Sequence, residues 1–289
     1  MSSSGDLTES ALSRVSVDEI MDKANEENFS VASRLLPKRY REHLLAIYGY
    51  ARFVDDIGDL AAGDRLAQLD WAEQEIRRAL SGTATHPIFI RAGATANACA
   101  IELSTLVDLI SANRQDQVKR RYATYAELLD YCALSANPVG QMVLAVFGES
   151  YPLTVSHSDE VCSALQIIEH LQDLAEDHSV DRCYLPAEDL ERFGVKEEDL
   201  AGTSSGAPLR GLVEFESERA RVLLAAGIPL VRLVHGFGRF AIAGFVGGGL
   251  AQLEAIERAN FEVLAKPVKA SKMSLIRHSL RVFLGRSQS

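Results

Sequence analysis

Residues 46–60 read AIYGYARFVDDIGDL and combine the pattern of a buried helix with a cluster of three carboxylates. Apolar residues at helical spacing predict the buried face of this helix: Ile47, Tyr50, Val54, Ile57 and Leu60. In its last turn, Asp55, Asp56 and Asp59 are spaced so that their oxygens should converge. Two such charges about 5 Å apart repel by roughly 3 kcal/mol at an effective dielectric near 20, and the helix dipole disfavours them further. Local helix energetics alone therefore do not explain the cluster.

A second acidic cluster occurs in residues 164–186, ALQIIEHLQDLAEDHSVDRCYLP. Here Glu169, Asp173 and Asp177 recur every four residues, which predicts an acidic stripe along one helix. Each cluster could be a solvated acidic face near a helix end, and for a single acidic pair that is the commoner case. Two such clusters could instead hold Mg²⁺ together with the oxygens of a bound phosphate. Spacing alone leaves both explanations open.

Composition and charge narrow the class of protein. The 289 residues are 47% hydrophobic, contain few prolines and follow a helical period, which predicts an all-α fold with one main domain. A formal net charge of −10 argues against a general nucleic-acid binder. The four cysteines lack CxxC spacing, so we expect free thiols and a reducing, cytoplasmic location. Neither a signal peptide nor a membrane-spanning segment is expected.

The helical pattern divides the chain into nine expected helices. They cover residues 8–27, 38–60, 64–80, 87–113, 116–148, 157–178, 208–234, 237–264 and 269–284. Pro138 lies inside one of them and should bend or break it, while residues 177–208 form a long connection of the kind that is often functional. We expect a partly helical N-terminal extension (1–24), a main domain (25–272) and a basic amphipathic tail (273–289).

Two long motifs carry a family resemblance: residues 27–59, ENFSVASRLLPKRYREHLLAIYGYARFVDDIGD, and residues 171–195, LQDLAEDHSVDRCYLPAEDLERFGV. Together they resemble the squalene/phytoene synthase family, most of all its HpnC branch, the hydroxysqualene synthases of bacterial hopanoid pathways. The similarity runs from about Asn25 to Lys272. It implies an all-α isoprenoid synthase fold with the two aspartate motifs on opposite walls of a central cavity, where they bind Mg²⁺ and a prenyl diphosphate.

The resemblance also implies roles for individual residues. The metal-binding positions would be Asp55, Asp56, Asp59, Asp173 and Asp177. Residues near the diphosphate or the reacting carbons would be Tyr48, Arg52, Tyr131, Gln166 and Arg182, and the catalytic set would be Tyr48, Arg52, Asp55, Asp59 and Asp173. The chain departs from the family at four points: Glu169 replaces a common Asn, Glu26 and Asn28 fall at Ser positions, and Gly249 falls near a C-terminal Tyr.

For the HpnC branch, the implied reaction starts from presqualene diphosphate. Mg²⁺-assisted loss of diphosphate, rearrangement of the carbocation and capture of water give hydroxysqualene, with functional coupling to a presqualene diphosphate synthase. Motifs common to the whole family leave a presqualene diphosphate synthase and a squalene or phytoene synthase open as alternatives. A more distant alternative is a non-catalytic helical scaffold or lipid-binding protein.

The tail from Lys266 to Ser289 reverses the overall charge sign. Its apolar residues recur at helical spacing and are flanked by cations: Met273, Ile276, Leu280 and Leu284, with Lys272, Arg277, Arg281 and Arg286 beside them. We expect an amphipathic helix that packs its apolar stripe against the domain. The alternative is peripheral contact with anionic lipid at the inner face of the membrane.

Overall fold

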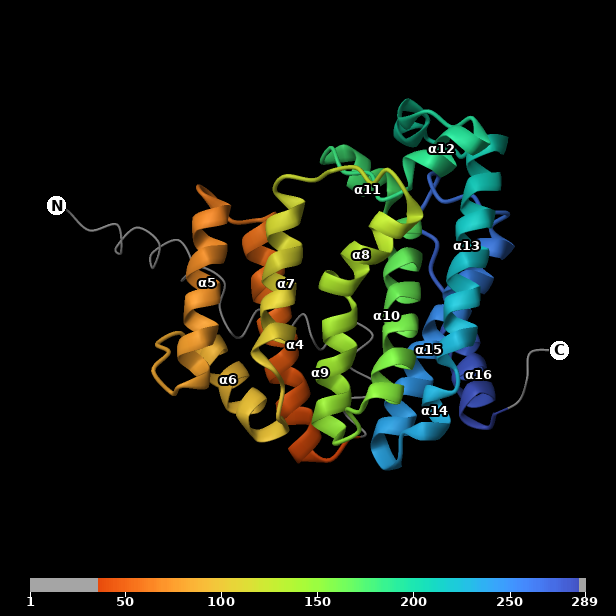
Figure 1. The fold of residues 1–289 in the computed structure, drawn as a ribbon. Coiled ribbons are helices and arrows are strands. Elements are labelled where there is room, and N and C mark those ends of the chain that lie inside the picture. Colours follow the sequence, from red (N-terminus) through yellow and green to blue (C-terminus); the bar gives the residue numbers. More distant parts are fainter. Residues whose placement is uncertain (1–35, 286–289) are drawn as a thin grey trace. The chain divides into compact units, whose positions relative to one another are not determined.

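The computed structural model describes residues 36–285, and every regular element in that range is a helix (Figure 1). The nearest approach to a sheet there is one isolated parallel bridge between Arg121 and Cys183. The predicted all-α class is therefore confirmed. The N-terminal extension, the helix predicted over 8–27, and Glu26, Asn28 and Arg286 lie outside the described residues.

The helices belong to two compact units of the chain. The first unit contains residues up to Val118 and Gln141–Gly148. Its helices are α4 (Lys38–Asp59), α5 (Arg65–Leu80), α6 (Pro87–Cys99), α7 (Leu103–Asp116) and the later part of α9 (Asn137–Phe147). Their core is aromatic: the Phe53 and Phe89 rings lie 5.6 Å apart edge to face, and the Tyr50 hydroxyl donates to the Leu106 carbonyl over 2.8 Å. These contacts fix α4 against α6 and α7.

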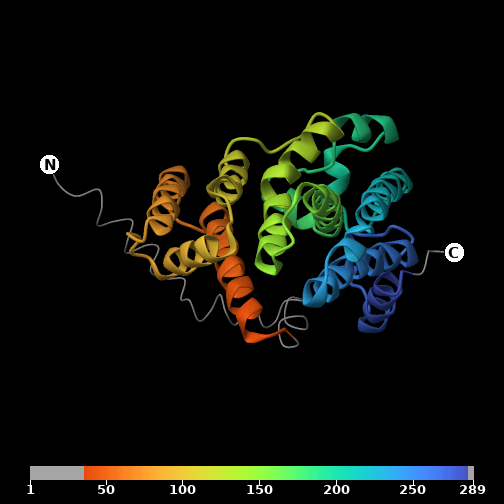
Figure 2. The same ribbon diagram turned by 60° about the horizontal axis from the view of Figure 1, so that its bottom comes forward.

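The second unit contains Lys119–Gly140 and Glu149 onward. Its helices are α8 (Tyr125–Ser135), the start of α9, α10 (Pro152–Gln172), α11 (Leu174–Ser179), α12 (Ala187–Phe193), the 3₁₀ helix η1 (Glu197–Ala201), α13 (Ala207–Gly227), α14 (Leu230–Leu233), α15 (Gly236–Arg258) and α16 (Lys272–Phe283). Helix α10 packs against α13 and α15, and α15 packs against α16 (Figure 2). The connection predicted over 177–208 is irregular with short helical turns, as expected.

Several helices end earlier than their pattern predicts. The helix expected over 87–113 is two helices, because Ala100 takes a left-handed conformation (φ 54°) that ends α6. The helix expected over 116–148 starts only at Tyr125, where the Thr124 side chain caps it, and breaks at Ala136 just before Pro138. Pro138 then lies in the first turn of α9, where the missing N–H of proline is tolerated, so the predicted break near Pro138 is confirmed.

The later helices are also divided. Pro229 separates α13 from α14 within the helix predicted over 208–234, and left-handed Asn260 and Phe261 follow the end of α15 within that predicted over 237–264. The helix predicted over 157–178 is interrupted at Asp173. Apolar periodicity continues through each of these breaks, so the pattern alone could not show them.

Two other expectations concern cysteines and membranes. All four cysteines are free thiols, as predicted, and Cys132 and Cys183 are buried. Within residues 36–285, no helix combines the length and the apolar character needed to cross a bilayer.

Candidate functional site

The first carboxylate set lies at the C-terminal end of α4, and its three aspartates face different surroundings. Asp55 and Asp59 are exposed, whereas Asp56 is buried with its Oδ1 3.1 Å from the Arg52 Nε. Partial loss of hydration raises the pKa of Asp55 to about 7, a hydrogen bond from Asn113 opposes this, and Asp59 adds to it. Asp55 is therefore a carboxylate that gains from a cationic ligand.

Asn113, on α7, holds Asp55 in place. Its Nδ2 donates to Asp55 Oδ1 over 3.0 Å and to the Leu109 carbonyl over 3.1 Å. Gly58 makes this approach possible, because a Cβ at that position would lie only 2.0 Å from Asn113 Oδ1. The glycine inside the DDIGD sequence therefore serves the packing of the residue that orients Asp55.

Arg65 compensates the electrostatic cost of placing acids at a helix C-terminus. Its guanidinium donates to the carbonyls of Gly58, Asp59 and Ala61 at 2.8–3.0 Å. Gln117 Nε2 also donates to the Gly58 carbonyl, over 3.0 Å. These donors satisfy the unpaired carbonyls of the last turn and place a positive charge at the negative end of the helix dipole.

The predicted apolar face of α4 is buried except at its last residue. Four residues of its predicted apolar face are buried, but Leu60 is 67% exposed because α4 ends at Asp59 and Leu60 only caps it. Tyr48 is half-buried on α4, one turn before Arg52. The helix thus presents Tyr48, Arg52, Asp55 and Asp59 within the first unit.

The second carboxylate set surrounds the break between α10 and α11. Asp173 ends one helix and begins the next, but the Asp173 N–H still donates to the Glu169 carbonyl (3.0 Å) and the Asp177 N–H to the Asp173 carbonyl (2.8 Å). The predicted acidic stripe therefore persists on an interrupted helix. Burial and the charges of Glu169, Asp177 and Glu176 raise the pKa of Asp173 to about 6.

An aromatic cluster adjoins this second set. The His170 ring stacks on the Tyr184 ring with centroids 3.7 Å apart, and Tyr131 lies 5.4 Å from Tyr184. The His170 Nδ1 is 3.7 Å from Asp177 Oδ2, and its Nε2 is 3.2 Å from the Gln166 amide. His170 therefore connects Gln166 with Asp177, and this connection was not predicted from the sequence.

Arg182 follows this set in the long connection. Its backbone N–H donates to the Asp177 carbonyl over 2.8 Å. The connection is held by Arg121, which pairs with Asp181 and Glu197 at 2.8 Å each. Of the predicted residues in the second unit, the structure brings Gln166, Asp173, Asp177, Tyr131 and Arg182 together through this framework.

Neither set is a ready-made metal cage. Over residues 36–285, no three carboxylate, imidazole or thiol groups come close enough to hold an ion by themselves. The accessible donors are carboxylate oxygens, which Mg²⁺ prefers, and Mg²⁺ typically takes only one or two of them together with water and substrate phosphate oxygens. The donors therefore fit Mg²⁺ brought with a phosphorylated ligand.

The family model for squalene/phytoene synthase matches residues 23–274. The chain belongs to the squalene/phytoene synthase family. Both carboxylate sets lie inside the matched range, together with Asn113, Arg65 and the His170–Tyr184 pair.

Within this enzyme family, the relatives of this chain include hydroxysqualene synthases. That of Sinorhizobium fredii is 35% identical over 73% of this chain and 73% of its own, and that of Rhodopseudomonas palustris is 37% identical over 71% and 70%. The crystal structure of squalene synthase HpnC from Alicyclobacillus acidocaldarius is 36% identical, with a TM-score of 0.79 over 87% of this chain and 98% of that one.

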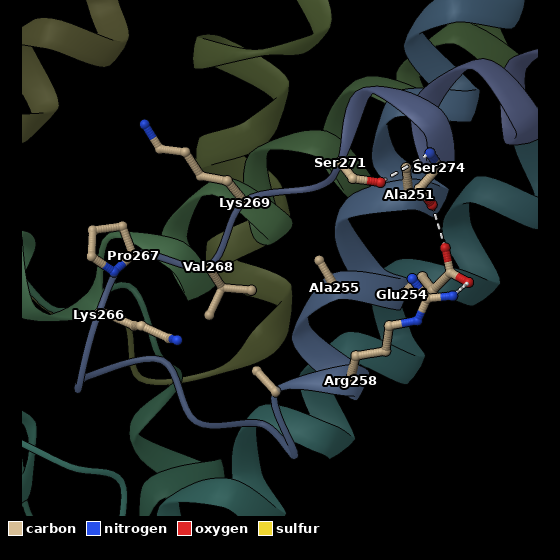
Figure 3. A pocket seen from close by; sticks show the side chains of 11 residues that line it. Ala251, Glu254, Ala255, Arg258, Lys266, Pro267, Val268, Lys269, Ser271 and Ser274 are labelled. Atoms are coloured by element: carbon tan, nitrogen blue, oxygen red, sulfur yellow. Dashed lines mark hydrogen bonds and ion pairs between the residues drawn. The ribbon is translucent and has the colours of Figure 1, made fainter.

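A solvent-open cavity of about 450 Å³ lies elsewhere in the second unit of this synthase-family chain, beside α15 and the start of α16 (Figure 3). It is lined by Ala251, Glu254, Ala255, Arg258, Ala259, Lys266, Pro267, Val268, Lys269, Ser271 and Ser274. None of the predicted site residues lines it.

Four residues that organise the two sets were not predicted from the sequence: Asn113, Arg65, His170 and Tyr184. A cation soon after a helix C-terminus is a readable signal for Arg65. Asn113 lies 58 residues after Asp55, and only the packing of α4 on α7 brings the two together.

Proposed function

We propose that this chain is a hydroxysqualene synthase that converts presqualene diphosphate and water into hydroxysqualene and diphosphate. The observation that carries the proposal is the ranking of relatives. Three hydroxysqualene synthases are 33%, 35% and 37% identical to this chain, whereas five phytoene synthases are 27% or 31% identical. Substrate supply then requires an enzyme that forms presqualene diphosphate, and we place the reaction in the cytoplasm.

In this proposal the carboxylates hold Mg²⁺ and the arginines hold the diphosphate. Asp55 and Asp59 of the first set, with Asp56, and Asp173 and Asp177 of the second set would be the metal ligands. The pKa values of Asp55 and Asp173 are raised because these carboxylates have lost hydration and lie near other negative charges. A bound cation would offset both unfavourable effects. When bound, Mg²⁺ neutralises charge that develops on the departing diphosphate.

The chain's own residues act on the substrate as follows. Arg52 and Arg182 supply positive charge for the diphosphate, so the carbon–oxygen bond breaks with its electron pair leaving on the diphosphate oxygen. Tyr48, half-buried one turn before Arg52, offers an aromatic face that would stabilise a nearby carbocation. A water oxygen then bonds to the rearranged cation and loses a proton, which balances the reaction without a reductant.

The test is product analysis after separate incubations with presqualene diphosphate and farnesyl diphosphate, with and without NADPH, in H₂¹⁸O. We expect ¹⁸O-labelled hydroxysqualene from presqualene diphosphate and Mg²⁺ alone. Squalene formed only with NADPH, or presqualene diphosphate or phytoene formed from prenyl diphosphates, would replace the proposal by one of the alternative family reactions.

Variants test the metal ligands. Asp55→Asn and Asp173→Asn should each abolish turnover while the protein stays folded, and EDTA should do the same to the wild type. Glu42→Gln is the matched control, because Glu42 is an exposed carboxylate on the same helix as Asp55. Wild-type turnover in either aspartate variant, or with EDTA present, contradicts the magnesium assignment.

A further inference from the structure

Helix α16 packs with its polar side inward. Val282 and Ser274 are its buried residues, and Ser279 fits against Gly247 of α15, where a Cβ would lie 2.4 Å from the serine hydroxyl. Both views show α16 lying along α15 (Figure 1 and Figure 2). The close approach of the two backbones is what a glycine on α15 permits.

Glu254 on α15 fixes this orientation. Its carboxylate accepts hydrogen bonds from the Ser274 hydroxyl, from the Arg277 guanidinium and, over 3.2 Å, from His278 Nε2. Arg258 Nη2 donates to it over 2.7 Å, and Figure 3 shows Glu254 between Arg258 and Ser274. The hydrogen bond from Ser274, followed by the Arg277 and His278 contacts, lowers the pKa of Glu254 to about 2. The carboxylate therefore stays ionised and holds α16 by its polar face.

The apolar stripe consequently points away from the protein, which corrects the predicted packing of this stripe against the domain. Met273 is 80% exposed, and Ile276, Leu280 and Leu284 are each more than half exposed. At about 100° per residue these four side chains fall within an arc of roughly 80°. Exposed Lys272 lies on one side of the arc and exposed Arg281 on the other.

Helix α15 extends this surface. Phe240 is exposed, and its ring stacks on the Phe283 ring of α16 at a centroid distance of 4.4 Å. Arg239 lies over the Phe283 ring, 4.6 Å from its centroid. The exposed surface is thus a continuous apolar face bordered by cations, which we call the α16 face: Phe240, Met273, Ile276, Leu280 and Leu284, with Lys272 and Arg281.

The positive charge around the α16 face indicates which kind of partner it binds. From Val263 to Ser289 the chain has six Lys and Arg and no Asp or Glu, within a protein of net charge −10. A symmetric contact between two copies would bring the same cations together, which is repulsive. An anionic bilayer instead accepts the apolar side chains and attracts the flanking cations.

We propose that the α16 face binds the surface of an anionic lipid bilayer, with α16 lying in the plane of the interface. Met273, Ile276, Leu280 and Leu284 enter the acyl boundary, while Lys272 and Arg281 contact lipid phosphates. The Glu254 contacts keep α16 on the protein, so the bilayer is bound by the folded enzyme.

Flotation of the full chain with vesicles tests the proposal without substrate, so the result is independent of the proposed reaction. Vesicles of phosphatidylcholine are compared with an equal mixture of phosphatidylcholine and phosphatidylglycerol, at low salt and at 1 M NaCl. At about 1 M salt the Debye length falls to roughly 3 Å, so attraction between the cations and the anionic lipids is screened. We expect binding only to the anionic vesicles at low salt.

Two variants and a control separate the contributions. Lys272→Gln/Arg281→Gln should weaken binding roughly 30-fold, or about fivefold per cation. Ile276→Gln/Leu280→Gln should weaken it at least tenfold with an unchanged thermal midpoint. Val222→Gln on α13 replaces a side chain that is 60% exposed and should bind like the wild type.

Three results would overturn the proposal. The first is failure of the flotation assay to depend on this face, seen as no flotation of the wild type or as equal binding by the wild type and the Ile276→Gln/Leu280→Gln variant. The second is a wild-type dimer in light scattering that this variant dissociates, which assigns the face to a second copy. The third is a lower thermal midpoint of the variant without lipid, which means that the chain itself covers the stripe.

Discussion

Replacement of Gly58 by alanine should destabilise the protein, although alanine is the better helix former. The new Cβ would lie 2.0 Å from Asn113 Oδ1 and 2.9 Å from its Cγ, so the Asn113 side chain must move. Overpacking of this kind costs about 1–3 kcal/mol. Loss of the hydrogen bond from Asn113 to the Asp55 carboxylate adds about 1–3 kcal/mol. The higher helix propensity of alanine offsets about 1 kcal/mol of this destabilisation. We expect a net loss of about 3 kcal/mol.

Urea unfolding of the metal-free protein, followed by circular dichroism and by the fluorescence of Trp71, measures this loss. The Trp71 ring lies 5.4 Å from the Phe89 ring and reports the core that supports α4. Gly248→Ala is the matched control, because a Cβ at that helical position meets nothing within 4 Å. The control should gain up to about 1 kcal/mol, so the two glycine substitutions should differ in sign.

A double-mutant cycle isolates the contact. If Gly58 is needed for Asn113, then Gly58→Ala should cost little in an Asn113→Ala background, with a coupling energy above about 1 kcal/mol. Additive effects of the two substitutions, or a Gly58→Ala variant as stable as Gly248→Ala, would refute the argument.

Three further predictions concern charged groups. Burial raises the pKa of Glu216 to about 8, so between about pH 4.5 and pH 8 the folded state binds more protons than the unfolded state. The free energy of unfolding should therefore fall as pH rises through that range. In urea unfolding, Glu216→Gln should make this fall smaller than in the wild type. Glu254→Gln should loosen α16 by about 1–2 kcal/mol, seen as faster hydrogen exchange in α16, and unchanged exchange there would contradict the anchoring role. The pKa of Asp55 is raised to about 7 and that of Asp173 to about 6, so protons should compete with Mg²⁺ for these carboxylates. In titration calorimetry, the apparent Mg²⁺ affinity should weaken as the pH is lowered from about 8 to about 6. An affinity independent of pH would count against Asp55 and Asp173 as ligands.

Much of the fold and the family could be predicted from the sequence. The helical period places helix starts close to where they occur, and Pro37, Pro87 and Pro208 each lie within one residue of the start of α4, α6 or α13. The two acidic motifs, in their order, indicate the squalene/phytoene synthase family that the comparisons establish. These features are local, because spacing along a helix and the missing N–H of proline act within a few residues.

Other features depended on residues far apart in the chain. The contrast between buried Asp56 and exposed Asp55 depends on how α4 packs, and the Asp55 contact comes from Asn113 on α7. The stacking of His170 on Tyr184 likewise joins α10 to the long connection.

The orientation of α16 is the clearest example of a feature that depends on residues far apart in the chain. The period of its apolar residues shows that Ile276 and Leu280 share a face, and this is a property of the helix by itself. Whether that face points inward depends on what the opposite side can bind. Glu254 and Gly247 of α15 offer an ionised acceptor and a close backbone approach, so the polar side of α16 is the one that packs.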